Sequence, residues 1–344
     1  MDTVTTLLLE EASYRDAPAP WFVLGGEAAL PAALAEEGHE VHWLPVMIAE
    51  RDAVGPDVVV CNDPDPAAFG RVILPVPLDR DLARRWILLA RDALAEGGDL
   101  VIGGANSAGA KSVIADATAV FGEPVASGYR QKHRVARFLR SGDHLHTPGW
   151  AVSEGIAPGT WQRFAFEAQG HRIALETQPG VFAGSRLDAG TALLLEHLPV
   201  PEGGRVLDVG CGAGVIGILS HRLGAAHVDL VDANLLAVET AARNLDRLSV
   251  PGRALASDTY DAVRGERYDL IASNPPFHRG KEVDTSVADR LIDGAPAHLL
   301  PGGELVIVAN AFLAYGKRMS RVFRHVETVA ATRQYHVLLA RDPR

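Results

Sequence analysis

The chain has 344 residues, the length of about two average domains. Its 33 Lys and Arg residues against 43 Asp and Glu residues give a net charge of −10. This charge excludes a protein that coats nucleic acid without regard to sequence, because such a protein needs a basic surface. A hydrophobic fraction of 47% excludes wholesale disorder.

The first part of the chain, to about residue 140, alternates short apolar runs with helical stretches. Runs between turn residues predict strands, and apolar positions that recur every three to four residues predict helices. The predicted strands cover 21–25, 39–45, 57–61, 71–75 and 99–103, and the helices 28–37 and 79–95. This alternation predicts a mostly parallel α/β sheet.

A segment rich in Gly, Pro, Ser and Thr, residues 141–160, predicts a linker between domains 1–140 and 161–344. The second domain opens with a predicted β-hairpin around Gln169 and Gly170. Its predicted strands cover 205–209, 227–232, 254–257, 268–273 and 304–309, followed by an antiparallel pair at 326–331 and 335–340. Helices are predicted at 215–223, 235–248, 288–299 and 315–323.

Two short matches suggest that the halves are copies of one fold. Residues 57–64 match 269–276, and residues 97–102 (GGDLVI) match 302–307 (GGELVI) in the same order. The N-terminal copy has no glycine-rich loop, and by the first match Asp63 stands where the other copy has Pro275. We therefore expect the first domain to be degenerate and to serve as a scaffold and an RNA-docking platform.

The strongest local signal is Asp-x-Gly-x-Gly-x-Gly between a predicted strand and a helix, formed by Asp208, Gly210, Gly212 and Gly214. Glycines let the backbone turn sharply and let a ligand lie against it. The dinucleotide fingerprint does not fit, because its third glycine would fall on Val215. The pattern instead resembles motif I of class I methyltransferases that use S-adenosylmethionine (SAM). Cys211 lies inside this loop as a small side chain.

Two acidic residues end the next strands. Asp232 can accept hydrogen bonds from the ribose hydroxyls of a nucleoside. The alternative is a helix N-cap, for which Asn234 is better placed. Asp258 can accept from an adenine amino group, or it can be a turn former.

The second strong signal is Asn274-Pro275-Pro276-Phe277 at the end of a predicted strand. The exocyclic amine of a base or an amide is a poor nucleophile, because its lone pair is delocalised. The side-chain oxygen of Asn274 and the carbonyl of Pro275 can each accept an N–H and align this amine. Phe277 offers a face on which a flipped base can stack. The sequence is typical of methyltransferases that modify planar amino groups.

Together these residues resemble the ribosomal RNA small-subunit methyltransferase C family (RsmC), a family of rRNA guanine-N2 methyltransferases related to the large-subunit enzyme RlmG. Residues 180–191 and 302–315 add to the likeness. It implies two tandem Rossmann-like class I methyltransferase domains in an α/β fold, with a degenerate N-terminal copy. Residues 309–315 favour the small-subunit enzyme.

The resemblance also implies site residues. Residues 274–277 would hold the target guanine. Phe182 and Asp188 match the segment that covers the cofactor and the active site. In this chain Gly184 and Ser185 precede Arg186, whereas the family more often has Ser-Arg directly after the Phe. The residues implied to hold SAM are Asp208, Gly210, Cys211, Gly212, Gly214, Asp232, Ala233 and Asp258, with Asp188.

A basic run at residues 129–140 is the strongest candidate for contacts with RNA phosphates in an acidic protein. The alternative is a solvated strand. Arg130, Lys132 and Arg134 are the residues that we expect to contact RNA. Arg318, Arg321 and Arg324 recur at helical spacing and have the same two readings. His144 and His146 lack a third ligand, so we expect no metal.

These observations predict a SAM-dependent methyltransferase that acts on a guanine of rRNA, with 16S favoured over 23S. Its partner would be ribosomal RNA or the small ribosomal subunit. The chain has no apolar run long enough for a transmembrane helix, no basic stretch like that of a secretory signal, and only two cysteines, so we expect a cytoplasmic monomer.

Three alternatives remain open. A protein glutamine-N5 methyltransferase acting on release factors usually has Tyr at the place of Phe277 and lacks a second methyltransferase-like lobe. A DNA adenine methyltransferase is disfavoured for the same reasons. A non-catalytic SAM- or RNA-binding protein has no need of an amine-orienting turn such as Asn274-Pro-Pro-Phe.

Overall fold

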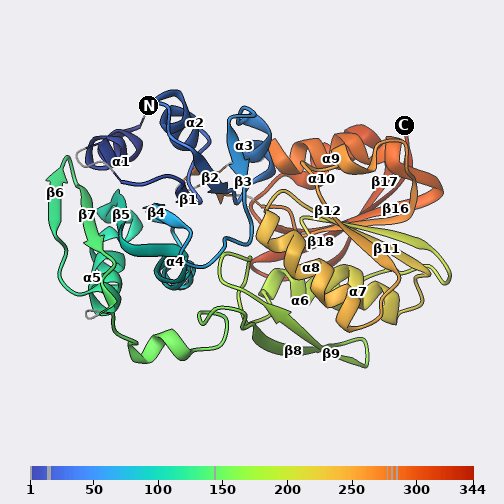
Figure 1. Cartoon of the computed structure of the whole chain (residues 1–344). Coiled ribbons are helices and arrows are strands. Elements are labelled where there is room, and N and C mark those ends of the chain that lie inside the picture. Colours follow the sequence, from blue (N-terminus) through green and yellow to red (C-terminus); the bar gives the residue numbers. More distant parts are fainter. Residues whose placement is uncertain (1, 14–16, 143–144, 277, 280–281, 284–285) are drawn as a thin grey trace. The chain divides into compact units, whose positions relative to one another are not determined.

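In the computed structural model the chain forms two compact units, each of which is an α/β fold (Figure 1). The first unit comprises Met1–Trp161 with Gln178–Gly180, and the second comprises Gln162–Thr177 with Val181–Arg344. The structure describes residues 2–13, 17–142, 145–276, 278–279, 282–283 and 286–344. The segment 141–160 lies in the first unit and includes the short helix η3 (Gly149–Val152). None of the described helices is long and apolar enough to cross a bilayer.

The first unit is built on a seven-stranded sheet in the order β3-β2-β1-β4-β5-β7-β6. Its strands are β1 (Trp21–Leu24), β2 (Val41–Leu44), β3 (Val58–Val60), β4 (Phe69–Pro75), β5 (Leu94–Ala105), β6 (Ala126–Arg130) and β7 (His133–Leu139). Strands β1 to β5 are parallel, and β7 and β6 add an antiparallel end. The helices are α1 (Thr3–Ser13), α2 (Ala29–Glu36), α3 (Ile48–Ala53), α4 (Arg80–Ala93) and α5 (Ala110–Phe121).

The second unit repeats this topology in the order β12-β11-β10-β13-β16-β18-β17. Its strands are β10 (Arg205–Val209), β11 (His227–Asp232), β12 (Gly252–Ala256), β13 (Tyr268–Ser273), β16 (Leu299–Asn310), β17 (Phe323–Ala331) and β18 (Tyr335–Pro343). The helices are α6 (Ala189–Glu196), α7 (Val215–Arg222), α8 (Leu235–Arg247), α9 (Ser286–His298) and α10 (Tyr315–Val322). Two hairpins, β8 (Gln162–Ala168) with β9 (His171–Thr177) and β14 (His278–Arg279) with β15 (Glu282–Val283), complete the unit.

The parallel strands of the second unit are buried on both faces, which explains why they read as continuous apolar runs. Successive residues of β10 pack into different cores: Val206 joins α6, α7 and α8, and Leu207 joins α9 and α10. Residues 270 and 271 of β13 divide in the same way. The sheet therefore lies between two helical layers. Because helices cover both of its faces, a ligand can reach the sheet at the ends of its strands.

The identical strand order confirms a duplicated fold, but only one of the two sequence matches is in register. Residues 97–102 and 302–307 lie on the equivalent strands β5 and β16, so that match is correct. Residues 58–60 form β3, whereas residues 269–273 belong to β13, which is the counterpart of β4. The first match is therefore wrong: a short apolar run that ends in a turn residue does not specify which strand it forms.

The strand registers show which residues of the first unit occupy the positions of the expected site. In the β4–β5 ladder Leu74 pairs with Ile102, as Ser273 pairs with Ile307 in the β13–β16 ladder. The next residue, Pro75, therefore stands at the position of Asn274. By the same registers Val23 stands at the position of Asp208, and Pro45 follows β2 where Asp232 ends β11. The first unit thus retains the fold but has lost these three polar side chains.

The one loop glycine that the first unit retains at an equivalent position is covered by side chains. Gly25 follows β1 as Gly210 follows β10, and its N–H donates to the carbonyl of Leu44. A Cβ built on Gly25 would lie 2.6 Å from the ring of Trp86, whereas a Cβ on Gly210 would meet no atom within 4 Å. Trp86 therefore fills in the first unit the space that stays open in the second.

Candidate functional site

The glycine loop of the second unit joins β10 to α7. Gly210, Gly212 and Gly214 have φ values of 73°, 54° and 83°, which residues with a Cβ rarely adopt. A Cβ at Gly210 or Gly212 would meet nothing within 4 Å. The backbone of this loop is consequently open on one side, as a loop that receives a ligand must be.

Close packing behind the loop requires a further glycine, Gly217, in the first turns of α7. A Cβ at Gly217 would lie 2.1 Å from the Cδ2 atom of Leu230 on β11. The Gly217 N–H donates a hydrogen bond of 3.0 Å to Oδ2 of Asp208. The loop, the helix and the strand are therefore fixed to one another at this point.

Asp208 is fully buried and does not line the pocket described below. Burial raises the pKa of this carboxyl to about 7, the negative charge of Asp232 adds to the rise, and the Gly217 N–H opposes it. Its second oxygen, Oδ1, accepts no hydrogen bond from any described residue. This position favours a role for Asp208 in holding the loop rather than in touching a ligand.

Asp232 fastens the loop to the end of β11. Its Oδ2 accepts from the Gly212 N–H at 2.9 Å, and its Oδ1 accepts from the Asn234 N–H at 2.9 Å. Burial raises the pKa of Asp232, and backbone N–H groups, including that of Ala233, oppose the rise. The N-cap of α8 is Asn234, whose Oδ1 accepts from the Leu236 N–H at 2.9 Å. Asp232 is thus not the N-cap of α8, and its remaining lone pairs can accept hydrogen bonds from hydroxyl groups.

Asp258 lies two residues beyond β12 and is about half exposed. Its carboxylate accepts two hydrogen bonds from Nη2 of Arg290, at 2.8 and 3.1 Å. An adenine amino group would therefore share this carboxylate with an arginine, which neutralises its charge.

The two expected motifs meet at neighbouring strand ends. Val209 and Ser273 are partners in the ladder of β10 and β13, and each directly precedes a motif residue, Gly210 or Asn274. The Ser273 hydroxyl donates to the Val209 carbonyl at 2.6 Å and fixes this pair. The glycine loop and the turn that begins at Asn274 are therefore adjacent at the carboxyl edge of the sheet, where ligands bind in open α/β sheets.

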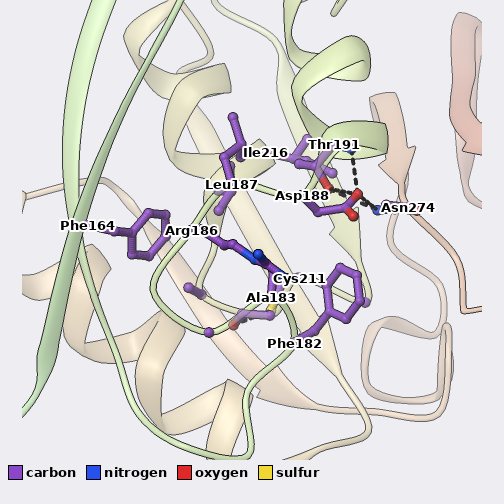
Figure 2. A pocket seen from close by; sticks show the side chains of 15 residues that line it. Phe164, Phe182, Ala183, Arg186, Leu187, Asp188, Thr191, Cys211, Ile216 and Asn274 are labelled. Atoms are coloured by element: carbon purple, nitrogen blue, oxygen red, sulfur yellow. Dashed lines mark hydrogen bonds between the residues drawn. The ribbon is translucent and has the colours of Figure 1, made fainter. Parts of the chain in front are cut away.

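The side chain of Asn274 is anchored by the first turn of α6 (Figure 2). Its Nδ2 donates to Oγ1 of Thr191 at 2.9 Å and to Oδ2 of Asp188 at 3.1 Å. Asp188 is itself the N-cap of α6 and accepts from the Thr191 N–H at 3.0 Å. A carboxylate only accepts, so the amide nitrogen must face Asp188. The Asn274 Oδ1 accepts no hydrogen bond from a described residue, so this oxygen is an acceptor without a donor in the described part of the chain.

The neighbours of Asn274 are partly described. Pro275 is buried and Pro276 is exposed. Phe277, which we expect to stack on a base, lies outside the described residues.

A pocket connects the glycine loop with Asn274. Figure 2 shows Phe182, Arg186 and Asp188 beside Cys211 and Ile216 at this pocket. Phe182 is 67% exposed and follows Val181 in a turn that includes Ala183 at a φ of 65°. The lining residues are Phe164, Phe182, Ala183, Gly184, Arg186, Leu187, Asp188, Thr191, Gly210, Cys211, Gly212, Ala213, Val215, Ile216 and Asn274. The pocket therefore brings together most of the site residues that the sequence predicts in segment 182–188 and in the glycine loop.

Sequence reasoning missed Thr191, although it named Asp188. An Asp just before an apolar helix is an N-cap signal, and because an N-cap side chain accepts from the N–H two or three residues on, it could have pointed to Thr191. Its contact with Asn274 joins positions 83 residues apart and has no sequence signal.

The basic run lies in the first unit, and the structure neutralises most of it. Arg130 pairs with Glu10 at 3.1 Å, and Arg140 pairs with Glu96 at 2.7 Å. Arg137 is buried between Glu11 and Asp99. Lys132 is exposed at the turn between β6 and β7, and Nε of Arg134 donates to Asn106 at 2.9 Å.

The remaining basic and histidine candidates add little. Arg318 on α10 pairs with Asp289 and Asp293, so it is not a free cation. In the described part of the chain no group of three His, Cys, Asp or Glu side chains is arranged to hold a metal ion. His144 lies outside the described residues.

The chain is similar to known methyltransferases both in sequence and in structure. The family model of the methyltransferase small domain matches residues 172–339. The ribosomal RNA small subunit methyltransferase C of Chromohalobacter salexigens is 39% identical over 268 residues, which are 77% of this chain and 76% of that protein. The protein of the same name from Pseudomonas aeruginosa is 33% identical over 281 residues, 80% of each chain.

A solved structure covers nearly the whole fold. The T. thermophilus 16S rRNA N2 G1207 methyltransferase (RsmC), in complex with AdoMet and guanosine, matches with a TM-score of 0.83 and 27% identity. The match covers 99% of this chain and 92% of that chain.

Proposed function

The chain belongs to the ribosomal RNA small subunit methyltransferase C family, and from that membership we propose that it transfers a methyl group from SAM to the exocyclic 2-amino group of a guanine in 16S rRNA. Ribosomal RNA is its substrate and SAM its cofactor. The observation that carries the proposal is the anchored amide of Asn274, whose Oδ1 faces no described donor beside the glycine loop.

The residues at the loop suit SAM, which carries a sulfonium and an ammonium group. Open space at Gly210 and Gly212 admits a ligand against the backbone. Asp188 lines the pocket with the loop, and Asp232 accepts from the Gly212 N–H, so two carboxylates lie near the loop and complement a cationic ligand. We propose that Asp232 accepts the ribose hydroxyls and that Asp258 receives the adenine amino group beside Arg290.

When bound, SAM supplies an electrophilic methyl group on a positively charged sulfur. The protein contributes alignment. The Asn274 Oδ1 and the Pro275 carbonyl accept the two N–H groups of the guanine amine and turn its lone pair toward the loop. Holding two reactants in line can lower a barrier by roughly 7–11 kcal/mol, so a strong general base is not needed.

We propose that Phe182, Arg186 and Phe277 close around the target base. Phe182 is exposed, and Arg186 lines the pocket next to the glycine loop. Both side chains belong to the turn that precedes Asp188 and line the pocket with Asn274, which supports a role in covering the base. Arg186 lies in this turn although Ala183 and Gly184 separate the Ser185-Arg186 pair from Phe182.

We assign catalysis to the second unit. The first unit has Val23, Pro45 and Pro75 where the second has Asp208, Asp232 and Asn274, and Trp86 covers its loop glycine. Its role in the proposal is to support the fold and to dock RNA. An rRNA substrate supports a location in the cytoplasm, and the expected monomer stays a prediction.

The proposal is tested by incubating the protein with methyl-labelled SAM and, separately, with 16S rRNA, small ribosomal subunits, 23S rRNA, a release factor and DNA. Label is expected in the 16S rRNA or in the small subunit. Label confined to the release factor would establish the glutamine-N5 alternative instead.

A further inference from the structure

The first unit has a groove of its own between helix α5 and the strands β6 and β7. On the helix, the lining residues Lys111, Ile114, Ala115 and Thr118 recur at the spacing of a single face. On the strands, the lining residues include Ser127, Gly128, Tyr129 and Arg134. The groove is therefore continuous with the surviving part of the basic run.

The groove follows from a packing difference between the two copies of the fold. In the second unit α10 packs on the edge strand β17. In the first unit the equivalent helix α5 packs on β7 instead of on the edge strand β6. Space is left between the helix and the edge strand, and Val135 and Ala136 form part of its floor.

An exposed aromatic ring lies in this groove with a cation over it. Tyr129 is 61% exposed, although large aromatic residues are normally well buried. The Cζ atom of Arg134 lies 5.2 Å from the centre of its ring. A ring so exposed and so held retains surface on which a planar group can stack.

The groove also holds unneutralised donors. Arg130, Arg137 and Arg140 are paired with carboxylates, but Lys111 has no acidic partner among the described residues. Within the described part of the chain, Nη1 and Nη2 of Arg134 and the Tyr129 hydroxyl likewise have no hydrogen-bond partner. Although the chain has a net charge of −10, free positive charge therefore lies beside an exposed ring in this groove.

We propose that this groove binds an unpaired nucleotide of the rRNA substrate. A base stacks on Tyr129, and Lys111 and Arg134 contact the adjoining phosphates. Glu123, which also lines the groove, repels a purely anionic ligand but can accept a hydrogen bond from a base amino group. This favours a nucleotide over an acidic peptide. The inference rests on the proposed function only in naming rRNA as the source of the nucleotide.

The direct test measures binding of a fluorescein-labelled single-stranded oligocytidylate of about ten nucleotides, whose bases carry an amino group, by anisotropy. This probe has no guanine, so it does not report the methylation pocket. Tyr129→Ala is expected to weaken binding roughly 5- to 100-fold, which is the effect of losing one base–aromatic stack, and Tyr129→Phe is expected to keep most of the affinity. Lys111→Gln is expected to weaken binding and to lower the slope of log affinity against log salt by about one.

Lys317→Gln is the matched control, because Lys317 is exposed on α10, the counterpart of α5. It is expected to bind like the wild type. No binding of the probe by the wild type, or equal binding by the wild type and Tyr129→Ala at unchanged melting temperature, would overturn the inference. Binding of an acidic peptide that depends on Tyr129, without binding of RNA, would overturn it as well.

Methylation measured on the same variants separates this inference from the proposed function. Tyr129→Ala is expected to raise KM for 16S rRNA with little change in kcat. A wild type that binds the probe through Tyr129 but methylates no rRNA would refute the proposed function alone. A wild type that methylates rRNA with the same KM as Tyr129→Ala would refute the groove alone.

Discussion

The side-chain nitrogen of Asn274 lies 2.9 Å from Oγ1 of Thr191, and this hydrogen bond joins the end of strand β13 to the first turn of helix α6. Together with the bond to Asp188 it fixes both the position and the orientation of the amide. Asn274, which we propose aligns the substrate amine, is thus held by a helix start that lies far away in the sequence.

Thr191→Val keeps the shape of this side chain and removes its acceptor. A hydrogen bond contributes about 1 kcal/mol net, so the loss of one of two anchors should lower kcat roughly fivefold. Affinity for SAM should not change, because Thr191 acts through Asn274. Thr191→Ser, which keeps the hydroxyl, should restore kcat. Equal kcat for the valine variant and the wild type would show that the anchor has no positioning role.

The buried carboxyl of Asp208 makes the stability of the apo protein depend on pH. Its pKa is raised from 3.8 to about 7 in the folded protein, so the folded state holds this proton where the unfolded state has released it. The stabilisation by this bound proton is fully present below the pKa of the unfolded chain, and it is lost as the pH rises through about 7. Between about pH 5 and about pH 7 the free energy of unfolding should fall by up to about 2 kcal/mol.

Asp208→Asn is the control for this dependence, because the amide does not titrate. Carboxylates whose pKa is lowered, such as Asp229 and Glu176, complete their titration at lower pH and do not act in this window. Urea denaturation of both proteins across the window gives the answer. The same slope in the wild type and in Asp208→Asn would assign the dependence to another group.

Gly217→Ala tests the close packing behind the loop. The new Cβ would lie 2.1 Å from Leu230, and overpacking of this kind costs roughly 1–3 kcal/mol of unfolding free energy. The double variant with Leu230→Ala should lose less unfolding free energy than the sum of the two single variants, because the clash is then removed. Additive losses in the double variant would contradict this explanation.

The stoichiometry of SAM binding tests the division of labour between the two units. Trp86 covers Gly25, and Val23 and Pro45 stand at the positions of Asp208 and Asp232, so one molecule should bind per chain. Gly212→Val, which places a β-branched side chain where φ is 54°, should abolish all binding measured by calorimetry. Residual binding at half the sites would mean that the first unit retains a functional pocket.

The fold and the two motifs could be predicted from the sequence because their signals are local. Periodic apolar positions and glycines at fixed offsets reflect backbone requirements that hold in any context. The assignment of the cap to Asn234 rather than to Asp232 also followed from local geometry and is confirmed. The match between residues 57–64 and 269–276 was wrong, because a short apolar strand carries no information on its place in the sheet.

The remaining features depend on contacts between distant positions. Asp208 reads as a ligand of the cofactor, but burial beneath α7 turns it inward. The sequence indicates the basic run as a candidate RNA contact, but Glu10, Glu11 and Glu96 neutralise three of its arginines. Thr191 joins the site only because α6 begins beside β13.

The most direct test of the account is the appearance of N2-methylguanosine in unmodified 16S rRNA, measured by nucleoside mass spectrometry after incubation of small ribosomal subunits with SAM. The wild type should form this nucleoside. Asn274→Ala should bind SAM with unchanged affinity and form the nucleoside at least 100-fold more slowly, roughly the loss that follows removal of an aligning group. Formation at the wild-type rate by Asn274→Ala would contradict the central role of the anchored amide.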